Sequence, residues 1–203
     1  MNRLFLLLIC LSLSSCGAYS VSKPGVLWNA ENYSNDAIQA YANDEWALAK
    51  KLFNRALTLY QSIDDQSGVL TSHINLVEVA LSTHDYQTAK GHLKWLNNEA
   101  IEQPRIVLLN ALLAIQQKQI AEAIILLQAI LPVFDGINLL DFPDDIMLAA
   151  IASRTKLAFM QKDNETTWTQ RYANALKKTT HQEHHSEALL LRFQSNLSST
   201  EGD

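Results

Sequence analysis

Residues 45–57 read Glu45-Trp46-Ala47-Leu48-Ala49-Lys50-Lys51-Leu52-Phe53-Asn54-Arg55-Ala56-Leu57. An aromatic residue is followed by alanine three positions later, by a large apolar residue seven positions later, and finally by Ala-Leu. Steps of three and four residues place these side chains on one face of a helix. Small alanine side chains in that face allow a second helix to approach closely. The stretch therefore predicts one helix of a tightly packed helical hairpin.

The same frame returns at two later places in the chain, and a small or medium residue stands nine positions before each start. The later frames are Tyr86, Ala89, Leu93 and Leu96, then Ile120, Ala123, Leu127 and Ile130-Leu131; the preceding residues are Ala37, Val77 and Ala111. A pattern that recurs at such offsets indicates a helical repeat. Because a lone hairpin cannot bury its apolar face, we predict an all-α fold of antiparallel hairpins stacked as a short solenoid.

The best copy of the frame resembles the tetratricopeptide repeat, whose second helix begins with Gly-Asp-Tyr-x-x-Ala. Asp85-Tyr86-Gln87-Thr88-Ala89 matches this start, with His84 in place of the glycine. The frames are 40 and then 34 residues apart. The second spacing equals the usual period of the family, and the first resembles the longer repeats of kinesin light chains. The resemblance implies a tetratricopeptide-like stack.

The pattern divides the chain into segments. We predict three hairpins over residues 29–132, and beyond Pro132 we expect helices near 143–161, 164–178 and 183–197. Trp168 stands where the frame requires a small alanine, so residues 133–199 are either a degenerate fourth repeat or a terminal cap. Terminal units of solenoids usually depart from the repeat pattern, and we favour the cap. Residues 200–203 are expected to be a disordered tail.

The first fifteen residues differ from the rest. Arg3 precedes the apolar run Leu4–Leu13, and the small residues Ser14 and Ser15 follow it. This order is typical of a secretory signal peptide. The run is far shorter than the roughly 20 residues that a membrane-spanning helix requires. We therefore expect residues 1–15 to be removed.

The segment Leu13-Ser14-Ser15-Cys16-Gly17 resembles the lipobox of bacterial lipoproteins. The resemblance implies covalent diacylglycerol and an N-acyl lipid on Cys16, with residues 16–28 as a lipidated tether and no other cofactor. Several acyl chains hold a protein firmly to a bilayer. Gly17 replaces the Asp of the inner-membrane sorting pattern, which favours the periplasmic face of the outer membrane. The alternative is an ordinary signal peptide with a chance cysteine just after its cleavage site.

Charge and motif content disfavour several classes of function. Without residues 1–15 the chain loses Arg3 and no acid, which leaves 15 basic against 21 acidic side chains. No basic stripe interleaved with aromatic residues is present, so we expect no nucleic-acid partner. The sequence contains no glycine-rich phosphate loop and no credible catalytic constellation. We therefore expect an adaptor rather than an enzyme.

The resemblance to tetratricopeptide repeats places candidate peptide-groove residues on the first helix of each hairpin. They are Asn35, Thr71, Asn75, Glu78, Leu112 and Gln116. An asparagine amide can both donate to and accept from an extended peptide backbone. The alternative is that these are ordinary solvated helix residues. The resemblance implies envelope proteins or peptides as partners, in secretion, pilus, outer-membrane or peptidoglycan machinery, and leaves the oligomeric state open.

A different function is suggested by His181, His184 and His185. Their spacing of three or four residues would place two imidazoles on one helical face, a geometry that can hold zinc or copper. A periplasmic metal or small-molecule carrier is therefore the alternative function. The competing interpretation is a polar helix start, and we predict no metal site.

Overall fold

The computed structural model describes residues 25–99, 103–136, 144–177, 191 and 194. The described ranges contain eight helices, which confirms the predicted all-α class. These are α2 (Gly25–Ala42), α3 (Trp46–Ser62), α4 (Gln66–Ser82), α5 (Tyr86–Glu99), α6 (Pro104–Gln116), α7 (Ile120–Gly136), α8 (Asp144–Gln161) and α9 (Glu165–Leu176).

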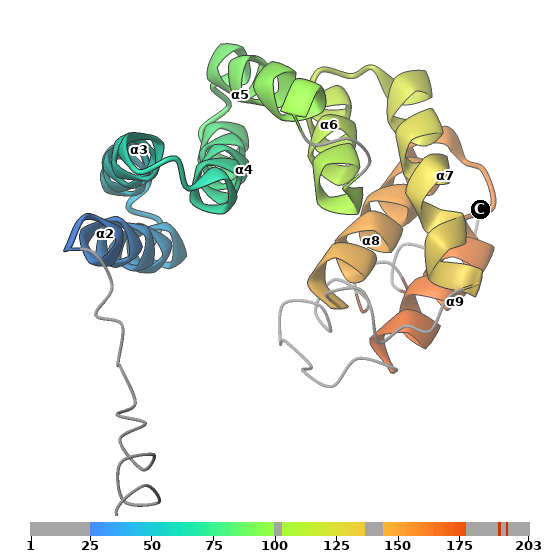
Figure 1. Cartoon of the computed structure of the whole chain (residues 1–203). Coiled ribbons are helices and arrows are strands. Elements are labelled where there is room, and N and C mark those ends of the chain that lie inside the picture. The colour runs from blue at the N-terminus through green and yellow to red at the C-terminus, as the bar shows by residue number, and fades with distance from the viewer. Residues whose placement is uncertain (1–24, 100–102, 137–143, 178–190, 192–193, 195–203) are drawn as a thin grey trace, which may run out of the picture.

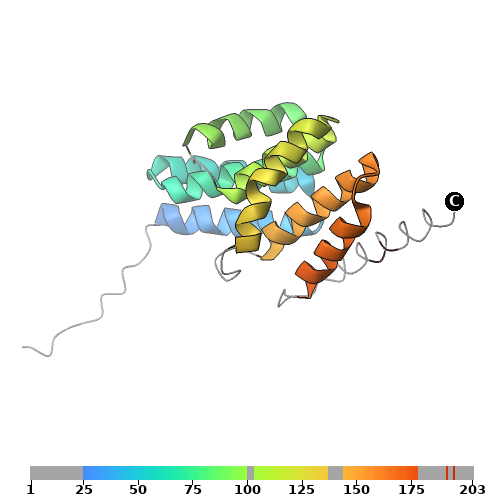
Figure 2. The same cartoon turned by 90° about the vertical axis from the view of Figure 1, so that its right-hand side faces the viewer.

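Consecutive helices pack as hairpins, and the hairpins follow one another along a curved stack. The pairs are α2 with α3, α4 with α5, α6 with α7, and α8 with α9. Figure 1 shows α2, α4, α6 and α8 on the inner side of the curve, with their partners on the outer side. Figure 2 shows the same helices from the side. The predicted solenoid of stacked hairpins is therefore confirmed.

The recurring alanines lie in the buried faces of their helices. Ala49, Ala89 and Ala123 are fully buried in α3, α5 and α7. Their partners across the hairpins are equally buried: Ala37, Val77 and Ala111 have no exposed surface. The large residues of the frame, Phe53, Leu93 and Leu127, are at most 2 % exposed. The spacing therefore identified the buried faces of three hairpins correctly.

The core consists of three clusters that each extend across neighbouring hairpins. The first joins α2, α3 and α4, the second joins α4, α5 and α6, and the third joins α6 with α7, α8 and α9. The inner helices α4 and α6 each contribute to two clusters, and Trp95 of α5 packs against both of the first two. Stability is thus shared between neighbours along the stack, as in other repeat folds.

The short connections share one geometry. In four three-residue turns the middle residue is left-handed, at Asp44, Asp64, His84 and Lys118, with φ between 54° and 61°. The following N–H donates to the carbonyl five residues earlier, as in the 2.8 Å bond from Asp85 to Ala80. This bond satisfies a carbonyl at the end of a helix. His84 therefore stands where glycine would be the least strained residue.

Helix length explains the unequal spacing of the frames. Both α3 and α4 contain 17 residues, whereas α5 contains 14 and α6 contains 13. The 40-residue spacing therefore covers two longer helices, and the 34-residue spacing covers two shorter ones.

Two predicted boundaries differ from those of the structure. Helix α2 begins at Gly25, so residues 25–28 are helical rather than part of a tether. A proline is compatible with the start of a helix, so Pro24 need not keep the chain irregular, and Leu27 packs against the first core cluster. Helix α7 continues through Pro132 to Gly136. An interior proline removes one hydrogen bond and can kink a helix without ending it.

The segment beyond α7 contains a fourth hairpin. Helices α8 and α9 lie close to the predicted ranges 143–161 and 164–178 and pack against each other. Their turn contains two left-handed residues, Lys162 and Asn164, where the earlier turns contain one. The amide of Trp168 donates to the carbonyl of Asn164 at 3.1 Å, as that of Ala89 does to Asp85 at 3.0 Å. Trp168 thus occupies the alanine position.

The bulky Trp168 side chain is accommodated at the edge of the fourth hairpin. It is partly buried, and the guanidinium carbons of Arg154 and Arg171 lie 4.8 and 5.0 Å from its ring centre. The next residue, Thr169, is 4 % exposed. The decay of the pattern therefore coincides with a second left-handed residue in the turn and a bulky side chain at the alanine position. The third helix expected near 183–197 and the tail at 200–203 lie largely or wholly outside the described residues.

Candidate functional site: a groove along the inner helices

A groove of about 420 Å³ lies on the inner side of the stack. All four inner helices contribute residues to it. The lining residues are Tyr41 of α2, Glu78, Leu81 and Ser82 of α4, Arg105, Leu108, Leu109, Leu112 and Gln116 of α6, and Ile146 and Ala149 of α8. Its volume falls within the range of about 300–1,000 Å³ that is common for ligand sites.

The floor of the groove is apolar. Leu108, Leu109 and Ile146 are at least nine-tenths buried, while Leu112 and Ala149 are partly exposed. Apolar surface that remains accessible gains free energy when a ligand covers it, at about 25 cal/mol per Å². The floor can therefore bind apolar side chains of a partner.

Two polar contacts connect neighbouring helices at the rim. Arg105 of α6 donates from Nη2 and Nε to Oε1 of Glu78 on α4, at 2.6 and 3.1 Å. Tyr41 and Ser82 share a hydrogen bond of 3.2 Å between their hydroxyl oxygens, which connects α2 to α4. A half-exposed ion pair contributes little to stability, about 0–1 kcal/mol. Its main effect here is to fix the Glu78 carboxylate and the Arg105 guanidinium at the rim.

Gln116, the last residue of α6, carries a buried polar atom without a partner. Its Oε1 has almost no accessible surface and accepts no hydrogen bond from any residue that the structure describes. An unsatisfied buried acceptor costs about 1–3 kcal/mol. A rotation of this partly exposed side chain toward the groove would let a ligand N–H reach the oxygen and recover part of that cost, so Gln116 is suited to accept from a peptide amide.

Three of the six predicted groove residues lie together in this groove: Glu78, Leu112 and Gln116. The other three do not line it. Asn35 and Thr71 are exposed, and Asn75 is partly buried. Thr71, Asn75, Glu78 and Ser82 form one stripe along α4, but only its C-terminal half borders the groove.

Several groove residues were not predicted. Arg105, Leu108 and Leu109 precede Leu112 and Gln116 at helical spacing, so a search along the same stripe of α6 would have found them. Ile146 and Ala149 required knowledge that α8 packs against α6. No sequence signal indicated the pairing of Glu78 with Arg105, because 27 residues separate them.

The remaining predicted sites lie outside the residues that the structure describes. These are Cys16 and the three histidines His181, His184 and His185. Within the described ranges, no three metal-ligating side chains gather in a cluster. None of the described helices has both the length and the apolar character needed to cross a bilayer.

Fold and groove together define a solenoid of helical hairpins with a groove on its inner side. No family model matches the chain, and neither a curated protein nor a solved structure shows significant similarity to it.

Proposed function

We propose that this protein is a lipid-anchored adaptor of the bacterial envelope. In this proposal, acylated Cys16 holds the chain at the periplasmic face of the outer membrane. The inner groove binds a peptide segment of a partner protein, and a tetratricopeptide-like stack presents that groove. The protein performs no bond-making chemistry.

The buried Oε1 of Gln116 is the observation that carries the groove part of the proposal. It lies beside apolar side chains, and none of the described residues donates a hydrogen bond to it. A peptide matches both features of the groove, because its backbone N–H can donate to the Gln116 oxygen and its apolar side chains can cover the floor. The fixed charges of Glu78 and Arg105 would restrict which segments fit.

The lipid part of the proposal rests on the N-terminal sequence. Leu13-Ser14-Ser15-Cys16 follows a short apolar run with a basic start. One acyl chain binds a membrane marginally, whereas two or three give stable attachment. A binding groove held at a membrane raises the local concentration of its partner there, which is the physical advantage of an anchored adaptor.

The groove is tested by photo-crosslinking in cells. A photo-reactive amino acid at position 112 is expected to capture a defined envelope protein, while the same group at position 51, on the exposed surface of α3, is not. Gln116→Met is expected to reduce the position-112 product about threefold to tenfold, since one hydrogen bond is lost. The free energy of unfolding should not fall, because the substitution removes an unsatisfied buried acceptor.

Equal capture at positions 112 and 51 would contradict the groove assignment. So would a Gln116→Met protein that remains stable and captures the partner as well as the original chain. Measuring the unfolding midpoint of each variant separates a lost contact from a lost fold.

Cys16→Ala tests the anchor independently. The variant is expected to lose labelling by radioactive palmitate completely and to remain uncleaved at the lipoprotein site, because acylation requires the cysteine sulfur. Replacement of Cys10 by alanine is the matched control, because Cys10 lies within the predicted signal peptide. Continued labelling of Cys16→Ala would refute the assignment.

A further inference from the structure

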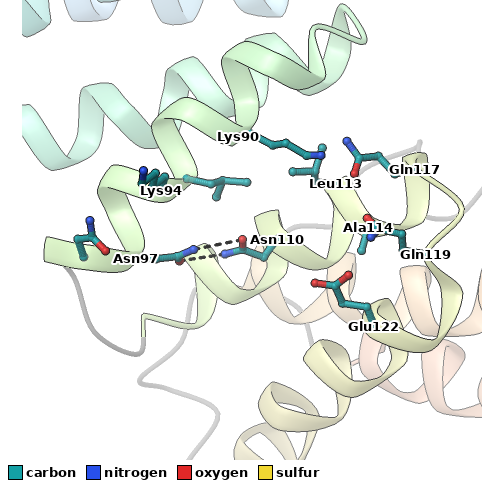
Figure 3. A pocket seen from close by; sticks show the side chains of 11 residues that line it. Lys90, Lys94, Asn97, Asn110, Leu113, Ala114, Gln117, Gln119 and Glu122 are labelled. Carbon is teal, nitrogen blue, oxygen red and sulfur yellow. Dashed lines mark hydrogen bonds between the residues drawn. The ribbon is translucent and has the colours of Figure 1, made fainter.

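A second pocket lies at the junction of the second and third hairpins, and it shares no residue with the inner groove. Figure 3 shows it between α5, α6 and the start of α7. Its volume is about 500 Å³, and its lining consists of Lys90, Leu93, Lys94, Asn97, Asn98, Asn110, Leu113, Ala114, Gln117, Gln119 and Glu122.

Two polar stripes at helical spacing form the walls of this pocket. Lys90, Lys94 and Asn97 follow one face of α5, and Asn110 faces them from α6 with Gln117 one residue beyond that helix. The walls are joined by a reciprocal amide pair in which Asn97 donates to Asn110 at 3.4 Å and Asn110 donates back at 3.1 Å (Figure 3). The pair fixes both amides at the edge of the pocket. Asn97 keeps one further N–H, whereas the second N–H of Asn110 donates to the carbonyl of Ile106 at 2.9 Å.

The floor between the walls is apolar. Leu93, Leu113 and Ala114 lie beneath the polar groups and are at least nine-tenths buried. A flat ligand that rests on this floor is surrounded by amides at its edges. The pocket therefore combines an apolar base with a polar rim, the general design of a small-molecule site.

Most of the polar groups in the lining have no side-chain partner in the part of the chain that the structure describes. Lys90, Lys94, Asn98, Gln117, Gln119 and Glu122 make no side-chain hydrogen bond or ion pair with any described residue. The two ammonium groups outnumber the single carboxylate, although the chain as a whole is acidic. The start of α7, with its partial positive charge, adds to the local positive potential. The charge of the lining therefore favours a ligand that carries a negative charge.

We propose that this pocket binds an oligosaccharide that bears carboxylate groups. Five carboxamides line it. All of them except Asn110, whose two N–H groups donate within the protein, can both donate and accept, which matches hydroxyl groups that do both. The C–H face of a sugar ring can lie on Leu93, Leu113 and Ala114. A carboxylate accepts from the ammonium groups of Lys90 and Lys94, and Glu122 on the opposite wall accepts from hydroxyls (Figure 3).

The test measures saturable binding to the full-length protein purified in detergent. The probes are trigalacturonic acid, its neutral methyl ester and a hexaglutamate peptide. We expect trigalacturonic acid to bind best, and the Lys90→Gln, Lys94→Gln double variant to weaken its affinity about tenfold, since charge-assisted hydrogen bonds are lost. The control is the Lys51→Gln, Lys156→Gln double variant, which removes the same charge from exposed sites outside the pocket.

Each other result overturns the proposal. Absence of saturable binding means that the pocket is only a solvated junction. If hexaglutamate binds as tightly as trigalacturonic acid, the pocket is an acidic-peptide site. If the methyl ester binds as tightly, the carboxylates of the ligand do not contribute to binding. An equal loss of affinity for trigalacturonic acid in both double variants indicates nonspecific electrostatic attraction. None of these results bears on the inner groove, because the crosslinking position lies outside this pocket.

Discussion

Replacing Gly68 with alanine is expected to lower the free energy of unfolding by about 1–3 kcal/mol, because the added methyl group overpacks a tight helix contact. Gly68 is buried in the first turn of α4, directly against the ring of Tyr60 near the end of α3. An added Cβ would fall well inside van der Waals contact with three ring atoms. Either the ring or the start of α4 must therefore move.

The glycine is needed for space and not for backbone freedom. No described glycine has a positive φ, so alanine fits the backbone conformation at position 68. The start of α4 is also fixed in place, since the Gly68 amide donates to Oδ1 of Asp65 at 3.0 Å. Moving α4 away from Tyr60 would also strain the 3.0 Å hydrogen bond from the Asp65 amide to the Tyr60 carbonyl, which joins this N-cap to the end of α3.

Gly91→Ala is the matched control, with an effect of opposite sign. Gly91 lies within α5, and an added Cβ would meet no atom within 4 Å. Alanine is favoured over glycine in a helix interior by about 0.5–1 kcal/mol, so this variant should be more stable. Urea denaturation of the full chain measures both changes.

A double-mutant cycle isolates the steric cause. In a Tyr60→Ala background all three contacting ring atoms are absent, so Gly68→Ala should be neutral or stabilising. If Gly68→Ala remains as harmful in that background, the cost arises elsewhere and the contact with Tyr60 is not its source.

The sequence predicted those parts of the fold that depend on local spacing. Ala49, Ala89 and Ala123 marked the helix contacts, because a small residue at a fixed step in an apolar face leaves room for a neighbouring helix. The sequence was less informative about where helices begin and end. The sequence predicts a tether through residue 28 and a hairpin boundary at Pro132, yet helices begin at Gly25 and continue past Pro132, since packing outweighs local preference.

Only half of the predicted groove residues line the groove, because packing between hairpins also decides which residues border it. Periodicity places Glu78, Leu112 and Gln116 on the correct faces of α4 and α6, but it does not say how far each stripe borders its neighbour. Asn35 and Thr71 lie on inner helices and are exposed. The positions of Arg105 and Ile146 depend on how hairpins stack, and long-range packing has no signal in spacing alone.

Lowering the pH from about 7 to about 5 is expected to reduce the free energy of unfolding by about 2 kcal/mol through His73 alone. His73 of α4 is 8 % exposed and stacks on Trp95, with ring centres 4.0 Å apart. Burial and the neighbouring His92 lower the pKa of His73 from 6.5 to about 4. The folded chain therefore holds this imidazole neutral where an unfolded chain would protonate it.

The contact between the His73 and His92 rings also favours a lowered pKa of His73. Nδ1 of His73 and Nδ1 of His92 lie 2.8 Å apart, so one nitrogen donates and the other accepts. Protonation of the accepting ring at Nδ1 removes the acceptor and brings two N–H groups together, while protonation of the donating ring places a positive charge in a largely buried contact. Burial also lowers the pKa of His92, and Lys50 of α3 lowers it further, while Asp85 at the start of α5 opposes this shift.

Because the pKa of His73 is lower in the folded chain than in the unfolded chain, stability decreases as the pH falls. Stability from His73 is fully present above about pH 6.5 and is lost as the pH falls toward 4, because the unfolded chain then binds more protons. His73→Phe retains an aromatic ring against Trp95 and removes the titrating group, so its stability should depend less on pH over this range. His84→Gln, at an exposed histidine, should retain the full pH dependence. The urea midpoint of the original chain and of both variants is measured at pH 7 and at pH 5. An equal decrease of the midpoint in all three proteins would show that the His73–His92 contact is not the cause.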